Sequence, residues 1–218
     1  MKLTWLKWGA VPLAVLMSTA GATVVLAQDQ SSPQSSAAAP TPAPDAEKKP
    51  TIEQRKENQQ DRIANGVNSG QLTAGETANL EKKQAALNQE ERDMRKLDNG
   101  KLTAGDKKTL TQQQNQLSKQ IYQDKHNSAV QNTNPKSEVG KRQENQQDRI
   151  AQGIKSGQLT AGEAAHLEHN QAKINQEVHA DRQANGGKLT AQEKAQVNRQ
   201  QNRQSRQIYR DKHNSRHQ

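Results

Sequence analysis

The sequence predicts an all-α protein, a tandem duplication of a slim three-helix unit that follows a disordered leader. Three observations lead to this prediction: a long block of residues occurs twice, a turn-and-cap phrase occurs four times, and apolar residues recur at helical spacing. No stretch alternates apolar and polar residues in the manner of a strand. Short turns between the helices favour antiparallel packing, so each unit is expected to be an antiparallel helical hairpin extended by a third helix.

The first element, residues 1–27, is expected to be a secretory signal peptide. Lys2 and Lys7 give a positively charged start, an apolar stretch follows, and Ala27 suits the position before a cleavage site, with Ala22 as an alternative. An uncleaved membrane anchor is the other interpretation, but polar residues interrupt a stretch that is short for a span. Loss of the two lysines with the signal would lower the formal charge from +9 to +7. We therefore expect a secreted or periplasmic protein with no transmembrane segment after cleavage.

The remaining chain divides into a linker, two repeats and a junction. Residues 28–50 are rich in Pro, Ser and Ala and are expected to be a disordered linker. The predicted helical repeats are residues 51–130 and 138–218, and residues 131–137, which include Pro135, join them. The sequence has no cysteine, which excludes disulfides, thiolate metal sites and lipidation through cysteine. Large apolar residues are sparse, so each repeat can bury only a thin core.

The duplication rests on an offset that stays constant along the repeat. Residues 58–63 (NQQDRI) return as residues 145–150, which is 87 positions later. The same offset maps residues 69–76 (SGQLTAGE) onto residues 156–163 and residues 124–127 (DKHN) onto residues 211–214. An offset held without slippage is typical of an internal repeat.

Short turn and capping motifs predict where the helices begin and end. The phrase Gly-x-Leu-Thr-Ala-x-acid places Thr at 73, 103, 160 and 190, and an acid three residues after each Thr gives the pattern of a capping box. The preceding glycine suits the turn that ends the previous helix. Leu72 and its equivalents have no apolar partner at the fourth helical position, so they must pack elsewhere. The predicted helices cover residues 51–65, 73–96, 103–125, 138–152, 160–183 and 190–215.

The DKHN element is expected to end the last helix of each repeat, with Lys and His beside the final carbonyl groups, where the helix dipole favours cations. The preceding Tyr122 and Tyr209 are expected to pack against the thin core with their hydroxyl groups in water.

The repeat resembles uncharacterised secreted repeat proteins found in several bacterial groups. The resemblance is carried by SGQLTxxE followed by IYxxKHN, and it covers residues 55–130 and 142–215. It implies export and duplication, and it brings no known activity with it.

A basic face on the last helix is the strongest functional candidate. Four arginines recur at steps of four, three and four residues, which places them on one side of a helix, while the first repeat holds mostly glutamine at these positions. Such a face is suited to an anionic envelope polymer or an acidic protein, whereas a solvated face that keeps the protein soluble is the alternative. No specific nucleic-acid binding is expected, because two tyrosines offer too few stacking platforms. The candidate residues are Arg199, Arg203, Arg206, Arg210 and Lys212.

Metal binding is the alternative function. The four turn phrases are similar to the second half of an EF-hand loop, but Arg95 and Arg182 stand at the first ligand position of two of them, and carboxylates are scarce in the others. A pair of histidines four residues apart could share a helix face, but no third ligand is specified. The candidate ligands of this alternative are Glu76, Asp106, Glu163, Glu193, His213 and His217.

The sequence thus favours an exported, non-enzymatic scaffold or interaction module of the cell envelope, for which we expect no cofactor. It contains no catalytic thiol, no glycine-rich phosphate loop and no nucleophile elbow. The runner-up is a divalent-metal-binding periplasmic protein. A third interpretation is a largely disordered mature chain that folds only on its partner.

Overall fold

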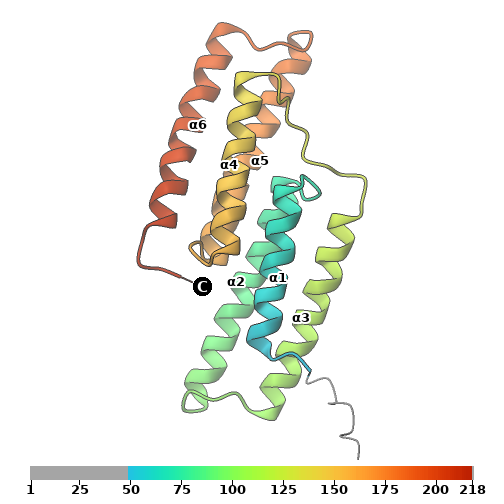
Figure 1. Cartoon of the computed structure of the whole chain (residues 1–218), viewed down its shortest axis with the longest axis vertical. Helices are drawn as coiled ribbons and strands as arrows, with labels where there is room; N and C mark the ends of the chain where they lie inside the picture. Colours follow the sequence, from blue (N-terminus) through green and yellow to red (C-terminus); the bar gives the residue numbers. More distant parts are fainter. Residues whose placement is uncertain (1–48, 218) are drawn as a thin grey trace, which may run out of the picture. The chain divides into compact units, whose positions relative to one another are not determined.

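Six α-helices and no strand make up residues 49–217, the part of the chain that the structure, a computed structural model, describes (Figure 1). This confirms the predicted all-α class. The predicted helix ranges agree with the structure to within a few residues. The helices are α1 (Ile52–Asn68), α2 (Ala74–Leu97), α3 (Ala104–Lys125), α4 (Glu138–Lys155), α5 (Ala161–Ala184) and α6 (Ala191–Lys212).

The predicted signal peptide and nearly all of the predicted linker lie outside the described residues. Within residues 49–217, no helix is both long enough and apolar enough to cross a membrane.

A threonine capping box begins every helix of the described part except α4. At α2, the backbone N–H of Glu76 donates to Thr73 Oγ1 (3.3 Å), and the backbone N–H of Thr73 donates to Glu76 Oε2 (2.9 Å). These bonds satisfy N–H groups that have no partner within the helix. At α4 the hydroxyl of Ser137 accepts from the N–H of Gly140, which has no side chain to return the bond. The capping boxes predicted at Thr73, Thr103, Thr160 and Thr190 are confirmed.

In the first interhelical turn of each half, a leucine packs on a glycine of the preceding helix. Leu72 is buried, and a Cβ added to Gly66 would lie 2.6 Å from its Cδ1 atom. The backbone N–H of Leu72 also donates to the carbonyl of Gly66 (3.0 Å). Leu159 and Gly153 repeat this arrangement, with the same 2.6 Å approach. The missing side chain of a helical glycine therefore provides the space that holds the turn against α1 or α4.

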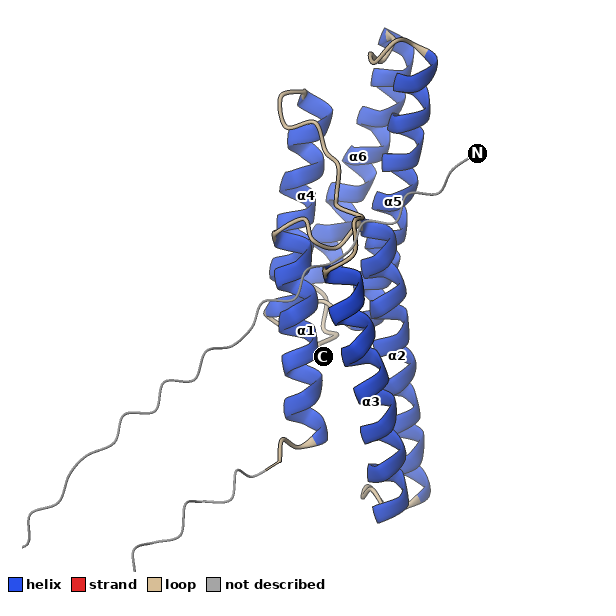
Figure 2. Ribbon diagram, turned by 90° about the vertical axis from the view of Figure 1, so that its right-hand side faces the viewer, coloured by secondary structure: helices blue, strands red, loops and turns tan. Residues whose placement is uncertain are grey.

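The apolar core is shared by the N-terminal half, α1–α3, and the C-terminal half, α4–α6. Two helices of the N-terminal half pack against the equivalent helices of the C-terminal half: α1 packs against α4, and α2 against α5. Both pairs run antiparallel (Figures 1 and 2). The main buried cluster therefore draws residues from both halves, among them Ile63, Leu80, Ile150 and Leu167. The described residues belong to one compact unit. Neither half alone could bury this much apolar surface, so the two halves bury it by packing their faces together.

A smaller apolar cluster lies within the C-terminal half alone. Val139 of α4, Ile174 and Val178 of α5, and Val197 of α6 are buried together, with Leu189 packed against them. This cluster packs the C-terminal part of α5 against the N-terminal part of α6. It thereby fixes the face that these two helices present to solvent.

Buried glutamines tie the helices together where apolar residues are lacking. The Nε2 of Gln59 in α1 donates to the carbonyl of Gln114 (2.6 Å) and to Ser118 Oγ (2.7 Å), both in α3. In the C-terminal half, Gln146 makes the equivalent bonds from α4 to α6. Hydrogen bonding of this kind is what permits polar side chains in an interior.

Two fully buried carboxyl groups lie where α2 and α5 pack against each other. Glu81 and Glu168 are 0% exposed, and each accepts one hydrogen bond from a buried amide, that of Gln60 (3.1 Å) or Gln147 (2.9 Å). Burial raises the pKa of each carboxyl to about 8, and the hydrogen bonds only partly oppose this shift. The negative charge of Glu81 also acts to raise the pKa of Glu168. Both groups are therefore mostly protonated at neutral pH.

Candidate functional site

The last helix presents one exposed row of arginines. Thr190 caps α6, and the buried side of the helix carries Val197, Gln201, Gln204 and Ile208. On the opposite side, four arginine side chains are exposed, and none of them forms an ion pair within the described part of the chain. We call this set the arginine stripe; it consists of Arg199, Arg203, Arg206 and Arg210.

Lys212, which the sequence grouped with these arginines, lies elsewhere. Its side chain is partly buried, and its Cγ atom would lie 3.3 Å from a Cβ added to Gly153 of α4. Burial lowers its pKa first, and the positive charge of Arg149 lowers it further. The stem of Lys212 therefore packs over α4, and its ammonium group is not part of the arginine stripe.

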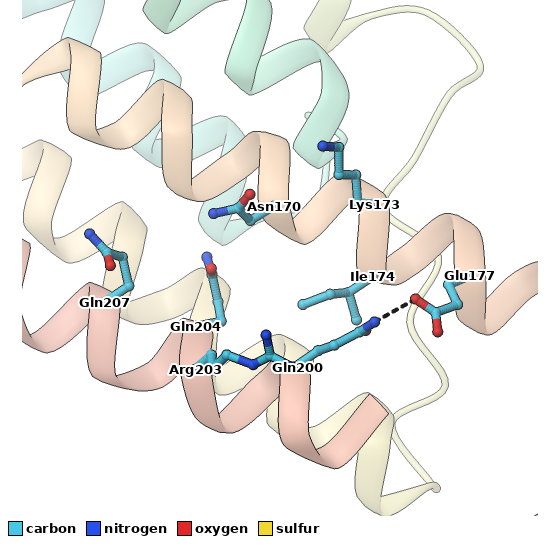
Figure 3. A pocket seen from close by; sticks show the side chains of 8 residues that line it. All are labelled: Asn170, Lys173, Ile174, Glu177, Gln200, Arg203, Gln204 and Gln207. Carbon is cyan, nitrogen blue, oxygen red and sulfur yellow. Dashed lines mark hydrogen bonds between the residues drawn. The ribbon is translucent and has the colours of Figure 1, made fainter. Parts of the chain in front are cut away.

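A hollow of about 290 Å³ opens between α5 and α6 beside the arginine stripe (Figure 3). Arg203 lines it from α6 and Lys173 from α5, with the ammonium group of Lys173 pointing away from α6 (Figure 3). The only carboxylate in its lining, Glu177, accepts hydrogen bonds from Gln196 (2.6 Å) and Gln200 (2.7 Å). The other lining residues are mostly amides, so the lining carries two cationic side chains against one carboxylate. The lining consists of Asn170, Lys173, Ile174, Glu177, Gln200, Arg203, Gln204 and Gln207.

A second hollow of about 750 Å³ continues from the first toward the end of α6. Gln207 lines both, so we treat them as one feature, the α5–α6 groove. Arg210 and Arg216 are its cationic residues, and Arg216 forms an ion pair with Glu163 (3.8 Å). Its two acids are engaged: Asp211 accepts from Gln207 (2.9 Å), and Glu163 accepts from Asn214 (2.7 Å) besides serving in its capping box.

The N-terminal half lacks this concentration of charge although its helices have the same plan. The position of Lys173 is Ala86 there, and Lys83 donates a hydrogen bond to Gln120 on the neighbouring helix. The arrangement of helices therefore does not require the arginines. The residues at the positions of the arginine stripe are Gln112, Gln116, Lys119 and Gln123.

The four acids considered as calcium ligands are all capping residues. Glu76 Oε2 accepts from Thr73 N (2.9 Å) and from Thr73 Oγ1 (2.7 Å), and its Oε1 accepts from Asn127 (2.6 Å). The bonds to the Thr103 side chain and backbone lower the pKa of Asp106, as those from Thr190 do for Glu193. Glu163 repeats the arrangement of Glu76 at α5. Among residues 49–217, no group of three or more His, Asp or Glu side chains is placed to hold a metal ion.

The proposed histidine pair is separated by the end of the helix. α6 was expected to continue to residue 215, but it ends at Lys212 with His213 as its cap, so His217 does not share a helix face with His213. The Nδ1 atom of His213 is hydrogen-bonded to the carbonyl of Tyr209 (2.7 Å). One ring nitrogen is thus already used to close the helix.

The tyrosine prediction was wrong. Tyr122 and Tyr209 were expected to pack against the core, but each is 59% exposed. Each ring stacks on the histidine four residues later, His126 or His213, with ring centroids 4.1 and 4.2 Å apart. The tyrosine therefore supports the local helix end, because residues at this spacing are neighbours on a helix surface.

The sequence predicted the arginine stripe but not the groove. Lys173 could have been noticed, because the offset pairs it with Ala86, but its place in the lining of the same hollow as Arg203 depends on how α5 packs on α6. The amides gave no signal, since Asn and Gln are abundant throughout the chain.

No known family model, no curated protein and no solved structure that was compared with this chain matches it.

Proposed function

We propose that this protein is an exported, non-enzymatic helical scaffold that binds an anionic polymer of the cell envelope through the α5–α6 groove and the arginine stripe. The observation that carries this proposal is the row of four exposed arginines that form no ion pair among residues 49–217, two of which, Arg203 and Arg210, also line the α5–α6 groove. Charged groups that the fold does not use are available to a ligand. An acidic protein is the second partner class that such a face fits.

The binding would be mainly electrostatic. Each guanidinium group offers several donors in a fixed geometry that suits carboxylate and phosphate groups. A polymer that contacts several arginines releases condensed counterions, so its affinity would fall steeply with salt. Neither tyrosine of the described part lines the groove, so it lacks the row of large aromatic side chains on which successive nucleobases stack.

We further propose that the two halves arose by tandem duplication of a three-helix unit and that the C-terminal half acquired the binding face. Two sets of equivalent contacts support this: the leucine–glycine contacts at Gly66 and Gly153, and the paired amide bonds of Gln59 and Gln146. The N-terminal half keeps the same contacts with nearly neutral residues on the corresponding face. It is therefore a built-in reference for which residues the fold needs and which serve binding.

The decisive experiment replaces the four arginines of the stripe by glutamine in the full chain, which gives three of the four positions the residue of the N-terminal half. Binding of polyphosphate and heparin is measured over a range of salt concentrations. We expect the affinity to fall by roughly 10- to 100-fold at low salt, and the slope of log K against log salt to become shallower by about one unit per lost contact.

A matched variant controls for net charge. Lys82, Lys101, Lys107 and Lys108 are exposed residues of the N-terminal half, and their replacement by Gln removes the same number of charges. This variant should keep most of the affinity and the slope. Equal losses in the two variants would mean that net charge, and not this face, attracts the polymer, and the proposal would be abandoned.

A further inference from the structure

A hollow of about 610 Å³ lies in the N-terminal half, where α1 begins, α2 ends and α3 begins. We propose that it binds a small anionic amphiphile, a single alkyl chain that ends in a carboxylate. This site is separate from the α5–α6 groove and does not depend on the proposed function. We call it the N-terminal hollow, and the residues of its lining that carry the argument are Ile52, Glu53, Arg95, Lys101, Leu102 and Lys107.

The start of α1 leaves apolar surface open that the start of α4 covers. Ile52 is partly buried and lines the hollow, whereas its equivalent, Val139, is 2% exposed. The junction before α4 can lie close to that helix because Gly140 has no side chain: an added Cβ would be 1.8 Å from the carbonyl oxygen of Asn134. The equivalent residue of α1 is Glu53, so no chain segment can approach α1 in the same way. The hollow is therefore open to a ligand.

The walls of the N-terminal hollow are held in place by hydrogen bonds between α1 and α3. The Nε2 of Gln114 donates to the carbonyl of Ile52 (2.9 Å), and a guanidinium nitrogen of Arg55 donates to Asn115 Oδ1 (2.8 Å). The hollow thus exists without a ligand, and its volume falls in the range of about 300–1,000 Å³ that is usual for small-molecule sites.

Two acids and two bases at one side of the hollow neutralise each other. Glu53 forms ion pairs with Lys56 (2.6 Å) and Arg95 (3.4 Å), and Arg95 is also paired with Glu91 (2.6 Å). The guanidinium group of Arg95 is therefore already engaged by protein carboxylates.

Two lysines in the lining have no such partner. Lys101 and Lys107 are exposed, and neither forms an ion pair within residues 49–217. In the C-terminal half, the equivalent of Lys107 is Lys194, which pairs with Glu138 (3.3 Å), but the position of Glu138 is Thr51 in the N-terminal half. Open apolar surface next to two unpaired ammonium groups suits a ligand with an apolar body and an anionic end.

The backbone around the hollow favours an alkyl chain over a peptide. The N–H of Thr51 donates to Gln54 Oε1 (2.9 Å), that of Gly100 to the carbonyl of Arg95 (2.7 Å), and that of Lys101 to the carbonyl of Asp98 (3.0 Å). The amide groups of a peptide would need hydrogen-bond partners that these N–H groups no longer offer. An alkyl chain has no such need, because removing its surface from water is enough to favour binding.

Three monomeric probes test the site by titration calorimetry on the full chain: dodecanoate, octanoate and dodecyltrimethylammonium. Dodecanoate should bind at least about tenfold more tightly than octanoate, because four more methylene groups leave water. Dodecyltrimethylammonium has the same chain and the opposite charge, and it should bind at least about tenfold more weakly than dodecanoate. In methyl NMR spectra, dodecanoate should shift the resonances of Ile52 and Leu102 and leave those of Val139 and Leu189 in place.

The variant Lys101→Gln/Lys107→Gln removes the cationic part of the site. Dodecanoate affinity should fall roughly 3- to 10-fold, since each ion pair at an exposed position contributes modestly. The control, Lys82→Gln/Lys108→Gln, changes exposed lysines outside the hollow and leaves the same net charge. It should keep dodecanoate affinity within about twofold of the wild type.

The variant Leu102→Ala reduces the apolar part of the site and should weaken dodecanoate binding roughly 3- to 10-fold. Its control is Leu189→Ala, the same change at the equivalent position, which should leave binding unchanged. If Leu102→Ala lowers the Tm, the lysine variants decide, because their side chains are exposed.

The outcomes also separate this site from the proposed function. Equal binding of dodecanoate and dodecyltrimethylammonium, equal losses in the two lysine variants, or methyl shifts confined to the C-terminal half overturn the site. Binding to phosphatidylglycerol vesicles without binding of monomeric dodecanoate overturns it in favour of a membrane surface. The four-arginine variant should bind dodecanoate like the wild type. The four-lysine variant, which includes Lys101→Gln and Lys107→Gln, should lose dodecanoate and keep polyphosphate, so the two proposals can fail independently.

Discussion

At the scale of single residues, the same amino acid serves opposite purposes at different positions of this chain. Gly66 lies under the side chain of Leu72, whose Cδ1 atom would be 2.6 Å from an added Cβ. Gly75, in the first turn of α2, has no atom within 4 Å of an added Cβ. Glycine lowers helix stability relative to alanine, so it is retained at Gly66 for space, whereas nothing in the structure requires it at Gly75.

We therefore expect Gly66→Ala and Gly75→Ala to change stability in opposite directions. Gly66→Ala should lower the free energy of unfolding by about 1–3 kcal/mol, because Leu72 must leave its packed position. Gly75→Ala should raise it by about 0.5–1 kcal/mol through the helix propensity of alanine. Urea denaturation of both variants measures the two effects. A gain in stability for Gly66→Ala would show that the turn moves freely, against the packing described above.

At the scale of elements, the helices begin where local chemistry dictates. In each capping box a threonine and an acid three residues later, or Gln54 at α1, satisfy the N–H groups that a helix start leaves open, and both groups come from one short segment. Tertiary contacts are not needed for this, so the starts of α2, α3, α5 and α6 followed from the sequence alone. Helix ends depend more on the surroundings, and α6 ended three residues before its predicted limit.

Capping at α3 gives the clearest test, because Thr103 and Asp106 both lie near solvent. Thr103→Ala should lower the free energy of unfolding by about 1 kcal/mol. Thr109→Ala, at an exposed position inside the same helix, removes the same atoms without touching a cap and should be neutral or slightly stabilising. Chemical denaturation compares the two variants. Equal effects would mean that the capping box contributes nothing at this helix.

The site illustrates the same division between local and tertiary information. Helical spacing alone placed Arg199, Arg203, Arg206 and Arg210 on one face. Lys173 lines the hollow beside this face only because α5 packs beside α6, and Lys212 is absent from the face because its stem covers Gly153 of another helix. Local periodicity determines which residues share a helix face, but it carries no information about which helix lies next to it.

At the scale of the whole molecule, the two halves are held together by an interface that contains buried carboxyl groups. Glu81 and Glu168 lie on α2 and α5, which pack against each other, and burial raises the pKa of both from 4.5 to about 8. In the unfolded chain they would titrate near the ordinary value. Between these two values the folded protein holds protons that the unfolded chain has released, so stability must fall as pH rises.

We expect the Tm to fall as the pH is raised from 5 toward 8 and this contribution to level off above pH 8, where the folded protein also loses the protons. The variant Glu81→Gln/Glu168→Gln keeps the shape of both side chains and cannot ionise. It should remove most of this slope and exceed the wild-type Tm at pH 8 by at least about 4 °C. Thermal unfolding followed by circular dichroism at each pH provides the measurement.

The exposed Glu57, replaced by Gln, is the control for this prediction and should leave the slope as it is in the wild type. If the double variant keeps the wild-type pH dependence, other groups govern it, and the buried pair is not the source of the instability at high pH.

The sequence by itself determined the helical class, the helix starts and the arginine stripe, because helical periodicity and capping act within a few residues of the chain. Only the tertiary structure decided that the halves share one core, that two glutamates are buried between them and that Lys173 lines a groove with Arg203. These features depend on which helix faces meet. The sequence pattern does not determine which helix faces pack together, because side-chain amides fill much of the interior in place of a continuous apolar stripe.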